Sequence, residues 1–296
     1  MLHLDRNIFN SILVLGPTAS GKTKLAVQLA HEQNGCVLSA DSRQVYKHLD
    51  IGTGKDLEEY IIDNKQIPYQ LIDIADLGTK YNLSNYINDF ANAWQGCEAA
   101  KQLPIVCGGT GLYLDAILKG HNYAHVPVDA AFRKKLESMS KQELLAYYHK
   151  LPQTSYHTLA DISTDRRLIR AIEIVAYLQY NIIEPTSFPE VKPYIIGINK
   201  TVELRREKIK TRLIYRLQNG LIDEVRSLLQ QGLTTEYLIK LGLEYKYITL
   251  YILGELDYAE MEEQLYNHIC QFAKRQMTWF RKMEREGCVI HWTPSF

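Results

Sequence analysis

The stretch GPTASGKT, residues 16–23, constrains the fold more than any other part of the sequence. It fits the pattern G-x-x-x-x-G-K-[ST], with the apolar run SILVLG before it and the helical pattern TKLAVQLAHEQN after it. Glycines in such a loop let backbone N–H groups surround a phosphate at a helix N-terminus, the lysine adds a point charge, and the hydroxyl can hold Mg²⁺. We therefore predict a phosphate-binding loop with Thr23 as the metal ligand, made of Gly16, Pro17, Thr18, Ala19, Ser20, Gly21, Lys22 and Thr23.

Further short apolar runs predict more strands, at residues 36–40, 104–109, 194–199 and 289–292. Helical patterns separate the first three strands, and this alternation is typical of an α/β fold whose parallel sheet has helices on both faces. Between Gly120 and Pro193 the patterns are helical only. The predicted organisation is a discontinuous core of residues 1–120 and 192–296, with a helical insertion at residues 121–191.

The composition is that of an ordinary globular protein, with 46% hydrophobic and 23% charged residues. No apolar run approaches the roughly 18 residues of a membrane span, and the start of the chain has no basic region with a cleavage site, so we expect a cytoplasmic protein without a membrane partner. The five cysteines form no C-x-x-C pair, which argues against a disulfide framework and a zinc site. Nothing in the sequence suggests an obligate partner chain, and a monomer is expected.

The net charge is zero, which by itself counts against a nucleic-acid partner. The charges are nevertheless unevenly placed. Residues 205–216, RREKIKTRLIYR, are strongly basic, whereas residues 254–264, GELDYAEMEEQ, are acidic. A neutral total is therefore compatible with one basic face.

Polar side chains follow the second and third predicted strands. Ligands of open α/β sheets bind outside the carboxyl ends of the strands, so both segments should face the phosphate-binding loop. Residues 41–44, Asp-Ser-Arg-Gln, offer a carboxylate, a hydroxyl, a guanidinium and an amide, and residues 108–111 offer the Thr110 hydroxyl among glycines. From the residues alone, Asp41 could instead cap a helix or form a salt bridge, and residues 108–111 could be a simple tight turn.

The residues at the strand ends help to decide whether the bound phosphate would be transferred, as in a kinase. A phosphoryl-transfer site of this class usually has a metal-organising Asp directly after a hydrophobic strand. The third predicted strand ends in Gly-Gly-Thr, which disfavours a kinase. Asp73, in YQLIDI, remains an alternative metal-organising carboxylate.

Six motifs recur in this order in the tRNA dimethylallyltransferases, and the resemblance spans residues 12–292: GPTASGKT, SADSRQVY, DIGTGK, VCGGTGLYLDAIL, DRRLIRAIEI and FAKRQMTWFRK. The chain thus resembles a family with a P-loop NTPase-like α/β core and an inserted all-helical tRNA-binding domain. The resemblance implies transfer of a dimethylallyl group from dimethylallyl diphosphate to the exocyclic amine of the adenosine 3′-adjacent to the anticodon, in tRNAs reading codons that begin with U. Diphosphate would be the leaving group, Mg²⁺ the cofactor, and the tRNA anticodon stem-loop the partner.

The resemblance also implies roles for individual residues. Asp41 would be the base that takes the amine proton, Thr110 would lie beside the reacting centre, and Arg212 would contact the diphosphate. Ser42, Arg43 and Gln44 would contact the target nucleotide together with Asp41 and Thr110. Further tRNA contacts would come from Arg133, Arg166, Arg167, Leu168, Ile169, Arg170, Tyr245, Lys246, Lys274 and Arg275. Residues 166–173 also fit an amphipathic helix with a solvated charged face.

The chain departs from the family pattern at Glu244, where a glycine commonly precedes the Tyr-Lys or Tyr-Arg pair of a late tRNA-contacting loop. Three alternatives to tRNA prenylation stay open: an adenylate isopentenyltransferase acting on free AMP, ADP or ATP, a P-loop small-molecule kinase, and a tRNA-binding paralogue without catalysis. The insertion with its arginines favours tRNA over free nucleotides. Retention of Lys22, Thr23, Asp41, Thr110 and Arg212 argues against a paralogue that has lost catalysis.

Overall fold

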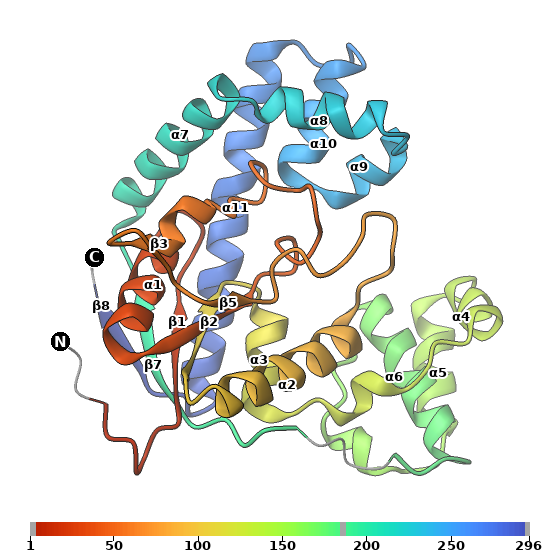
Figure 1. The fold of residues 1–296 in the computed structure, drawn as a ribbon. Helices are drawn as coiled ribbons and strands as arrows, with labels where there is room; N and C mark the ends of the chain where they lie inside the picture. The colour runs from red at the N-terminus through yellow and green to blue at the C-terminus, as the bar shows by residue number, and fades with distance from the viewer. Residues whose placement is uncertain (1–3, 184–187, 294–296) are drawn as a thin grey trace. The chain divides into compact units, whose positions relative to one another are not determined.

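The computed structural model describes residues 4–183 and 188–293. The chain forms two compact units, one of Met1–Lys119 with Pro189–Phe296 and one of Gly120–Phe188. Figure 1 shows the elements of both units.

The first unit is built on a six-stranded sheet with the order β5-β2-β6-β1-β7-β8, in which every pairing is parallel. Its strands are β1 (Ser11–Leu15), β2 (Gly35–Ala40), β5 (Tyr69–Gln70), β6 (Leu103–Gly108), β7 (Pro193–Ile198) and β8 (Ile290–Thr293). The predicted α/β class is confirmed. Strands β1, β2 and β6 are buried along their whole length, which explains why they read as continuous apolar runs.

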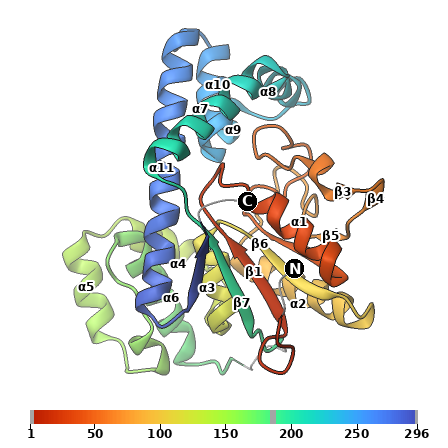
Figure 2. The ribbon, with the colours of Figure 1, turned by 90° about the vertical axis from the view of Figure 1, so that its left-hand side faces the viewer.

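Helices cover both faces of the sheet (Figure 2). Val37 packs in the cluster of α1 (Lys22–Gln33), whereas its neighbour Cys36 contacts Cys97 of α2 (Leu83–Ala99). Because successive side chains of a strand point to opposite faces, α1 and α2 lie on opposite sides. All five cysteines carry free thiols.

Five further helices form a second core in this unit: α7 (Val202–Gln218), α8 (Leu221–Gln230), α9 (Thr235–Leu241), α10 (Leu243–Ile252) and α11 (Tyr258–Arg285). Their buried side chains pack with Val45 and Leu49 from the segment after β2. Asn219 is the C-cap of α7, and Gly220 follows it directly. Gly220, at φ 97°, begins α8, and its left-handed backbone makes the sharp turn between the two helices possible.

Near the sheet lie α3 (Gly111–Lys119), the short hairpin β3 (Ile61–Ile62) and β4 (Lys65–Gln66), and the 3₁₀ turn Leu57–Tyr60. The second unit contains α4 (Ala130–Glu137), α5 (Lys141–Lys150) and α6 (Asp165–Leu178), with 3₁₀ turns at Asn122–His125 and Ser155–Thr158 and no strand among its described residues. Its three helices pack around Leu136, Leu144, Leu168 and Ile172. Across the described part of the chain, no helix has the length and apolar character needed to cross a membrane.

Candidate active site

A cavity of about 1200 Å³ in the first unit opens where three neighbouring strands end. Residues 18–23 follow β1, residues 41–44 follow β2, and residues 109–112 follow β6. The remaining walls come from α7, α10, α11 and the segment of residues 52–59. The expectation that the second and third strand ends face the phosphate-binding loop is therefore confirmed.

The loop after β1 has the backbone of a phosphate cradle. Ala19 and Gly21 are in the left-handed region, at φ 60° and 90°, and Gly21 precedes the first residue of α1. Lys22 and Thr23 line the cavity. Gly16 and Pro17 are buried and are not part of the cavity wall, and a Cβ on Gly16 would lie 2.6 Å from Ser20 Oγ.

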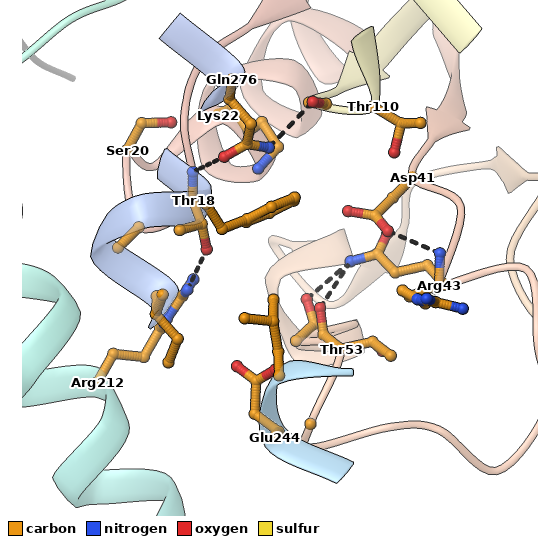
Figure 3. A pocket seen from close by; sticks show the side chains of 18 of the residues that line it. Thr18, Ser20, Lys22, Asp41, Arg43, Thr53, Thr110, Arg212, Glu244 and Gln276 are labelled. Carbon is orange, nitrogen blue, oxygen red and sulfur yellow. Dashed lines mark hydrogen bonds between the residues drawn. The ribbon is translucent and has the colours of Figure 1, made fainter. Parts of the chain in front are cut away.

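Two helices hold the loop at Thr18. The Thr18 N–H donates to Gln276 Oε1 of α11 at 2.8 Å, and the Arg212 guanidinium of α7 donates to the Thr18 hydroxyl (Figure 3). Burial, with a further contribution from Arg216, lowers the pKa of Arg212 to about 10, so it remains charged at neutral pH. Among the described residues Arg212 forms no ion pair. A partly buried cation without an ion-pair partner is well suited to a polyanionic ligand.

Asp41 lies across the cavity from Thr18 and Arg212 (Figure 3). One carboxylate oxygen accepts the Arg43 N–H at 2.9 Å. The carboxylate neither caps a helix nor forms an ion pair among the described residues, so both structural alternatives are excluded. The Thr110 hydroxyl accepts the Ser42 N–H at 3.0 Å, and the Thr110 N–H donates to the Ala40 carbonyl at 3.2 Å. These bonds fix Asp41 and Thr110 on adjoining segments.

The glycines after β6 allow α11 to approach. A Cβ on Gly109 would clash with Gln276, and one on Gly111 would clash with the indole of Trp279. The segment is the tight connection between β6 and α3, and it is also a packing surface for α11 and a wall of the cavity.

Asp73, the alternative metal-organising carboxylate, is paired with Lys55. The Lys55 ammonium also contacts Asp50 at 2.6 Å and the Tyr46 carbonyl at 2.9 Å, and its side chain is 1% exposed. Asp73 does not line the cavity. Asp73 is therefore not placed to organise a metal ion at the phosphate-binding loop.

Of the residues in the first unit that are expected to contact tRNA, some line the cavity, and others lie outside it or are already hydrogen-bonded. Ser42, Arg43, Gln44, Lys246 and Arg275 line the cavity, whereas Lys274 is exposed on α11 outside it. The Gln44 amide is already bonded to Ser39 Oγ and to the Gly54 carbonyl. Tyr245 also lines the cavity, but it is only 2% exposed and donates its hydroxyl proton to Glu224.

In the second unit, Arg133 and Arg170 bind Glu173, whose side chain is 2% exposed. Arg170 also donates to the Val126 carbonyl at 2.7 Å. The side chains of Leu168 and Ile169 are not available for the expected RNA contacts, because both are buried in the core of this unit. Of the arginines on α6, Arg167 pairs with Asp161, and Arg166 is exposed.

Glu244, the departure from the family pattern, lies in the cavity wall beside the cationic side chains of α7. Burial raises the pKa of its carboxyl, and Arg212 and Arg216 act in the opposite direction. Its side chain therefore faces the same space as the phosphate-binding loop.

Sequence reasoning missed the residues that connect these segments. Gln276 joins the loops after β1 and β6. Glu224 accepts the N–H groups of Asp50, Ile51 and Gly52. The glycines of DIGTGK were a usable signal, because side chains at Gly52 and Gly54 would meet Tyr245 and Arg216.

The fold and the site define a parallel α/β protein with a phosphate-binding loop facing a carboxylate and a hydroxyl. The IPP transferase family model matches residues 44–283, and the isopentenyl transferase model matches residues 9–69. The chain belongs to the IPP transferase family and is a prenyl-transferring enzyme.

Named relatives extend along nearly the whole chain. The tRNA dimethylallyltransferase 2 of Phocaeicola vulgatus is 50% identical over 287 residues, which cover 96% of this chain and 92% of that protein. The tRNA dimethylallyltransferase 2 of Bacteroides fragilis is 50% identical over 290 residues, covering 97% and 93%. The crystal structure of the full-length tRNA isopentenylpyrophosphate transferase from Bacillus halodurans matches with a TM-score of 0.68 at 30% identity, covering 96% of this chain and 90% of that one.

Proposed function

We propose that the protein transfers a dimethylallyl group from dimethylallyl diphosphate to the exocyclic amine of the adenosine 3′-adjacent to the anticodon. The substrates would be tRNAs that read codons beginning with U, and the product isopentenyladenosine. The observation that carries the proposal is the cavity in which Asp41 and Thr110 face a phosphate-binding loop. The relatives named tRNA dimethylallyltransferase support the choice of substrate.

The reaction needs a base and a site for a departing anion. The lone pair of an adenine amine is delocalised into the ring, so a base must take the amine proton as the new C–N bond forms. Asp41 is that base, and Thr110 lies beside it. As the bond between the allylic carbon and the diphosphate oxygen breaks, charge develops on the diphosphate. Lys22, Arg212 and the N–H groups of the loop stabilise that charge, at about 3 to 4 kcal/mol for each well-placed donor.

The residues present fit a magnesium ion. Mg²⁺ usually binds one or two protein oxygens together with substrate phosphates and water. Thr23 is the last residue of the loop and lines the cavity, and among the described residues no cluster of three acidic, His or Cys side chains forms a separate metal cage. Thr23 would hold the ion, which would neutralise charge on the bound diphosphate.

Recognition of tRNA uses both units. The target base must leave the stack of the anticodon loop before its amine can reach Asp41. Ser42 and Arg43 are available to contact it at the cavity wall. Arg166 would contact phosphates from the helical unit, which we assign as the tRNA-binding domain, with the sheet unit as the catalytic core. We infer that the enzyme acts in the cytoplasm, where its tRNA substrate is found, and that it is a monomer.

Alkylation of free adenine nucleotides is the second candidate, favoured by the match of residues 9–69 to the isopentenyl transferase model. The much longer match of residues 44–283 to the IPP transferase model supports tRNA instead.

The test is to incubate the protein with an unmodified anticodon stem-loop, labelled dimethylallyl diphosphate and excess AMP. We expect label at one adenosine after nucleoside digestion and diphosphate in solution. Label on AMP would establish the second candidate, and an ATP requirement with release of ADP would indicate a kinase.

A further inference from the structure

Gln276 connects two loops of the candidate active site. It lies on α11 and is 4% exposed. Its Oε1 accepts the Thr18 N–H at 2.8 Å, and its Nε2 donates to the Gly109 carbonyl at 3.0 Å (Figure 3). One side chain thereby joins the phosphate-binding loop to the segment that carries Thr110.

The chemistry of this position requires an amide. An acceptor is needed toward Thr18 and a donor toward Gly109, and glutamine supplies both at one end of an unbranched chain. The backbone of Gly109 passes so close that a Cβ there would clash with the Gln276 amide. The helix itself is fixed by neighbouring buried side chains, Ala273 before Gln276 and Met277 and Phe280 after it.

The connection determines which groups of the loop can contact a phosphate. The Thr18 N–H is bound by a protein oxygen, and the Thr18 hydroxyl is bound by Arg212. Thr18 is therefore held by α11 and α7 together, and Ala19 to Thr23 are left to surround the ligand.

We infer that Gln276 is a positioning residue, which sets the distance between the bound diphosphate and the acceptor side of the cavity at Asp41 and Thr110. This inference rests on the proposed function. Transfer between two separately bound groups is sensitive to alignment, and a displacement of about 1 Å can lower the rate about 100-fold.

The test compares Gln276→Met, Gln276→Glu and the matched control Gln271→Met, which changes an exposed glutamine on the same helix. For Gln276→Met we expect kcat for prenylation to fall about 100-fold, with KM for tRNA within a few fold of wild type. The affinity for inorganic diphosphate should fall about 10-fold, because the loop is no longer held. The control should match the wild-type protein in each measurement.

Gln276→Glu tests the same contact through the protonation of its side chain, measured at pH values where thermal melts show the variant to be folded. At high pH its carboxylate would repel the Gly109 carbonyl, whereas the protonated carboxyl would donate to it as the amide does. The kcat of this variant relative to wild type should therefore rise as the pH falls. A ratio independent of pH, or a Gln276→Met enzyme within twofold of wild type in kcat, would overturn the inference.

The diphosphate titration separates this inference from the proposed function. A wild-type protein that binds diphosphate but prenylates no tRNA contradicts the proposed function. In that case an unchanged diphosphate affinity in Gln276→Met would also reject a positioning role, and a 10-fold loss would support control of the loop by Gln276.

Discussion

Asp41 combines a fixed backbone with a carboxylate that faces the cavity. Its bond from the Arg43 N–H is local, so Asn can keep it through its own side-chain oxygen. We expect Asp41→Asn to lower the single-turnover rate of prenylation by about 100-fold to 10,000-fold, the range for a lost general base. Affinity for tRNA should stay within a few fold. Asp223→Asn, at an exposed residue outside the cavity, is the control, and a fully active Asp41→Asn enzyme would remove Asp41 from its assigned role.

Arg212 is a partly buried cation that contacts the phosphate-binding loop. Removing a charged donor to a phosphate typically costs about 1.5 to 3 kcal/mol. Arg212→Ala should therefore weaken binding of inorganic diphosphate by about 10-fold to 100-fold in calorimetry. Arg206→Ala, on an exposed position of the same helix, should bind diphosphate like the wild-type protein. Equal affinities in the two variants would contradict the assignment.

Glu244 makes stability depend on pH. Because burial raises its pKa, the folded state holds its proton more tightly than the unfolded state does. Its contribution to stability is fully present below the unfolded pKa and is lost as pH rises through the folded pKa. Glu244→Gln should therefore have a larger free energy of unfolding than wild type at about pH 7, and the same value at about pH 3. The measurement is urea denaturation at both pH values, with the exposed Glu255→Gln as control. If the free energies of unfolding of Glu244→Gln and wild type differ by the same amount at both pH values, the raised pKa of Glu244 is contradicted.

At the residue scale, local sequence patterns identified the groups that lie at strand ends. Asp41 and Thr110 were found because each follows an apolar run, and Lys22 because it belongs to the G-x-x-x-x-G-K-[ST] pattern. Gln276 was missed because its partner Thr18 is 258 residues away and nothing local marks the contact. Lys55 was missed for a related reason, since its burial depends on carboxylates from two other segments.

At the scale of elements, the segment Asp50–Lys55 is stabilised by the ion pairs of buried Lys55 with Asp50 and Asp73. Removing one partner of a buried ion pair typically lowers the free energy of unfolding by about 3 to 5 kcal/mol. For Lys55→Met we expect a loss of about 3 kcal/mol, because Asp50 is open to water. Lys47→Met removes an exposed pair with Asp76 and should cost at most about 1 kcal/mol. Denaturant unfolding of both variants tests the difference. Equal losses of stability would show that burial of Lys55 has no energetic weight.

The arginines of α6 divide into two groups with different expected effects. Arg166 is exposed, so Arg166→Ala should weaken tRNA binding and reduce the salt slope by about one unit without changing the melting temperature. Arg170 binds buried Glu173, so Arg170→Ala should lower the melting temperature. Salt titrations of tRNA binding measure the salt slope of each variant, and thermal melts measure its melting temperature. If Arg166→Ala binds tRNA like wild type at every salt concentration, α6 is only a solvated amphipathic helix.

Elements could be predicted from sequence where their pattern was long or strongly apolar. The five predicted strands and the helices of both units are present in the structure. Strand β5 was not predicted, because it has two residues and pairs with β2 only through tertiary contact. The hairpin of β3 and β4 is equally short.

At the scale of the whole molecule, the parallel order of the sheet follows from strand–helix alternation and the rules of crossover connections. The packing of α7, α10 and α11 onto the loops of the site could not be read from the sequence. It depends on glycines that allow close approach and on long-range hydrogen bonds such as those of Glu224. The residues at the strand ends could therefore be predicted from the sequence, whereas the helices that form the other walls of the cavity could not.

The central claim is that the phosphate-binding loop holds a leaving group, which departs as Asp41 takes a proton from the acceptor amine. The most direct measurement follows diphosphate release and isopentenyladenosine formation in one reaction of wild-type protein, tRNA and dimethylallyl diphosphate without ATP. The account predicts one diphosphate for each isopentenyladenosine, with both products lost together in Asp41→Asn. Diphosphate release without modified tRNA, or modification only when ATP is consumed, would contradict it.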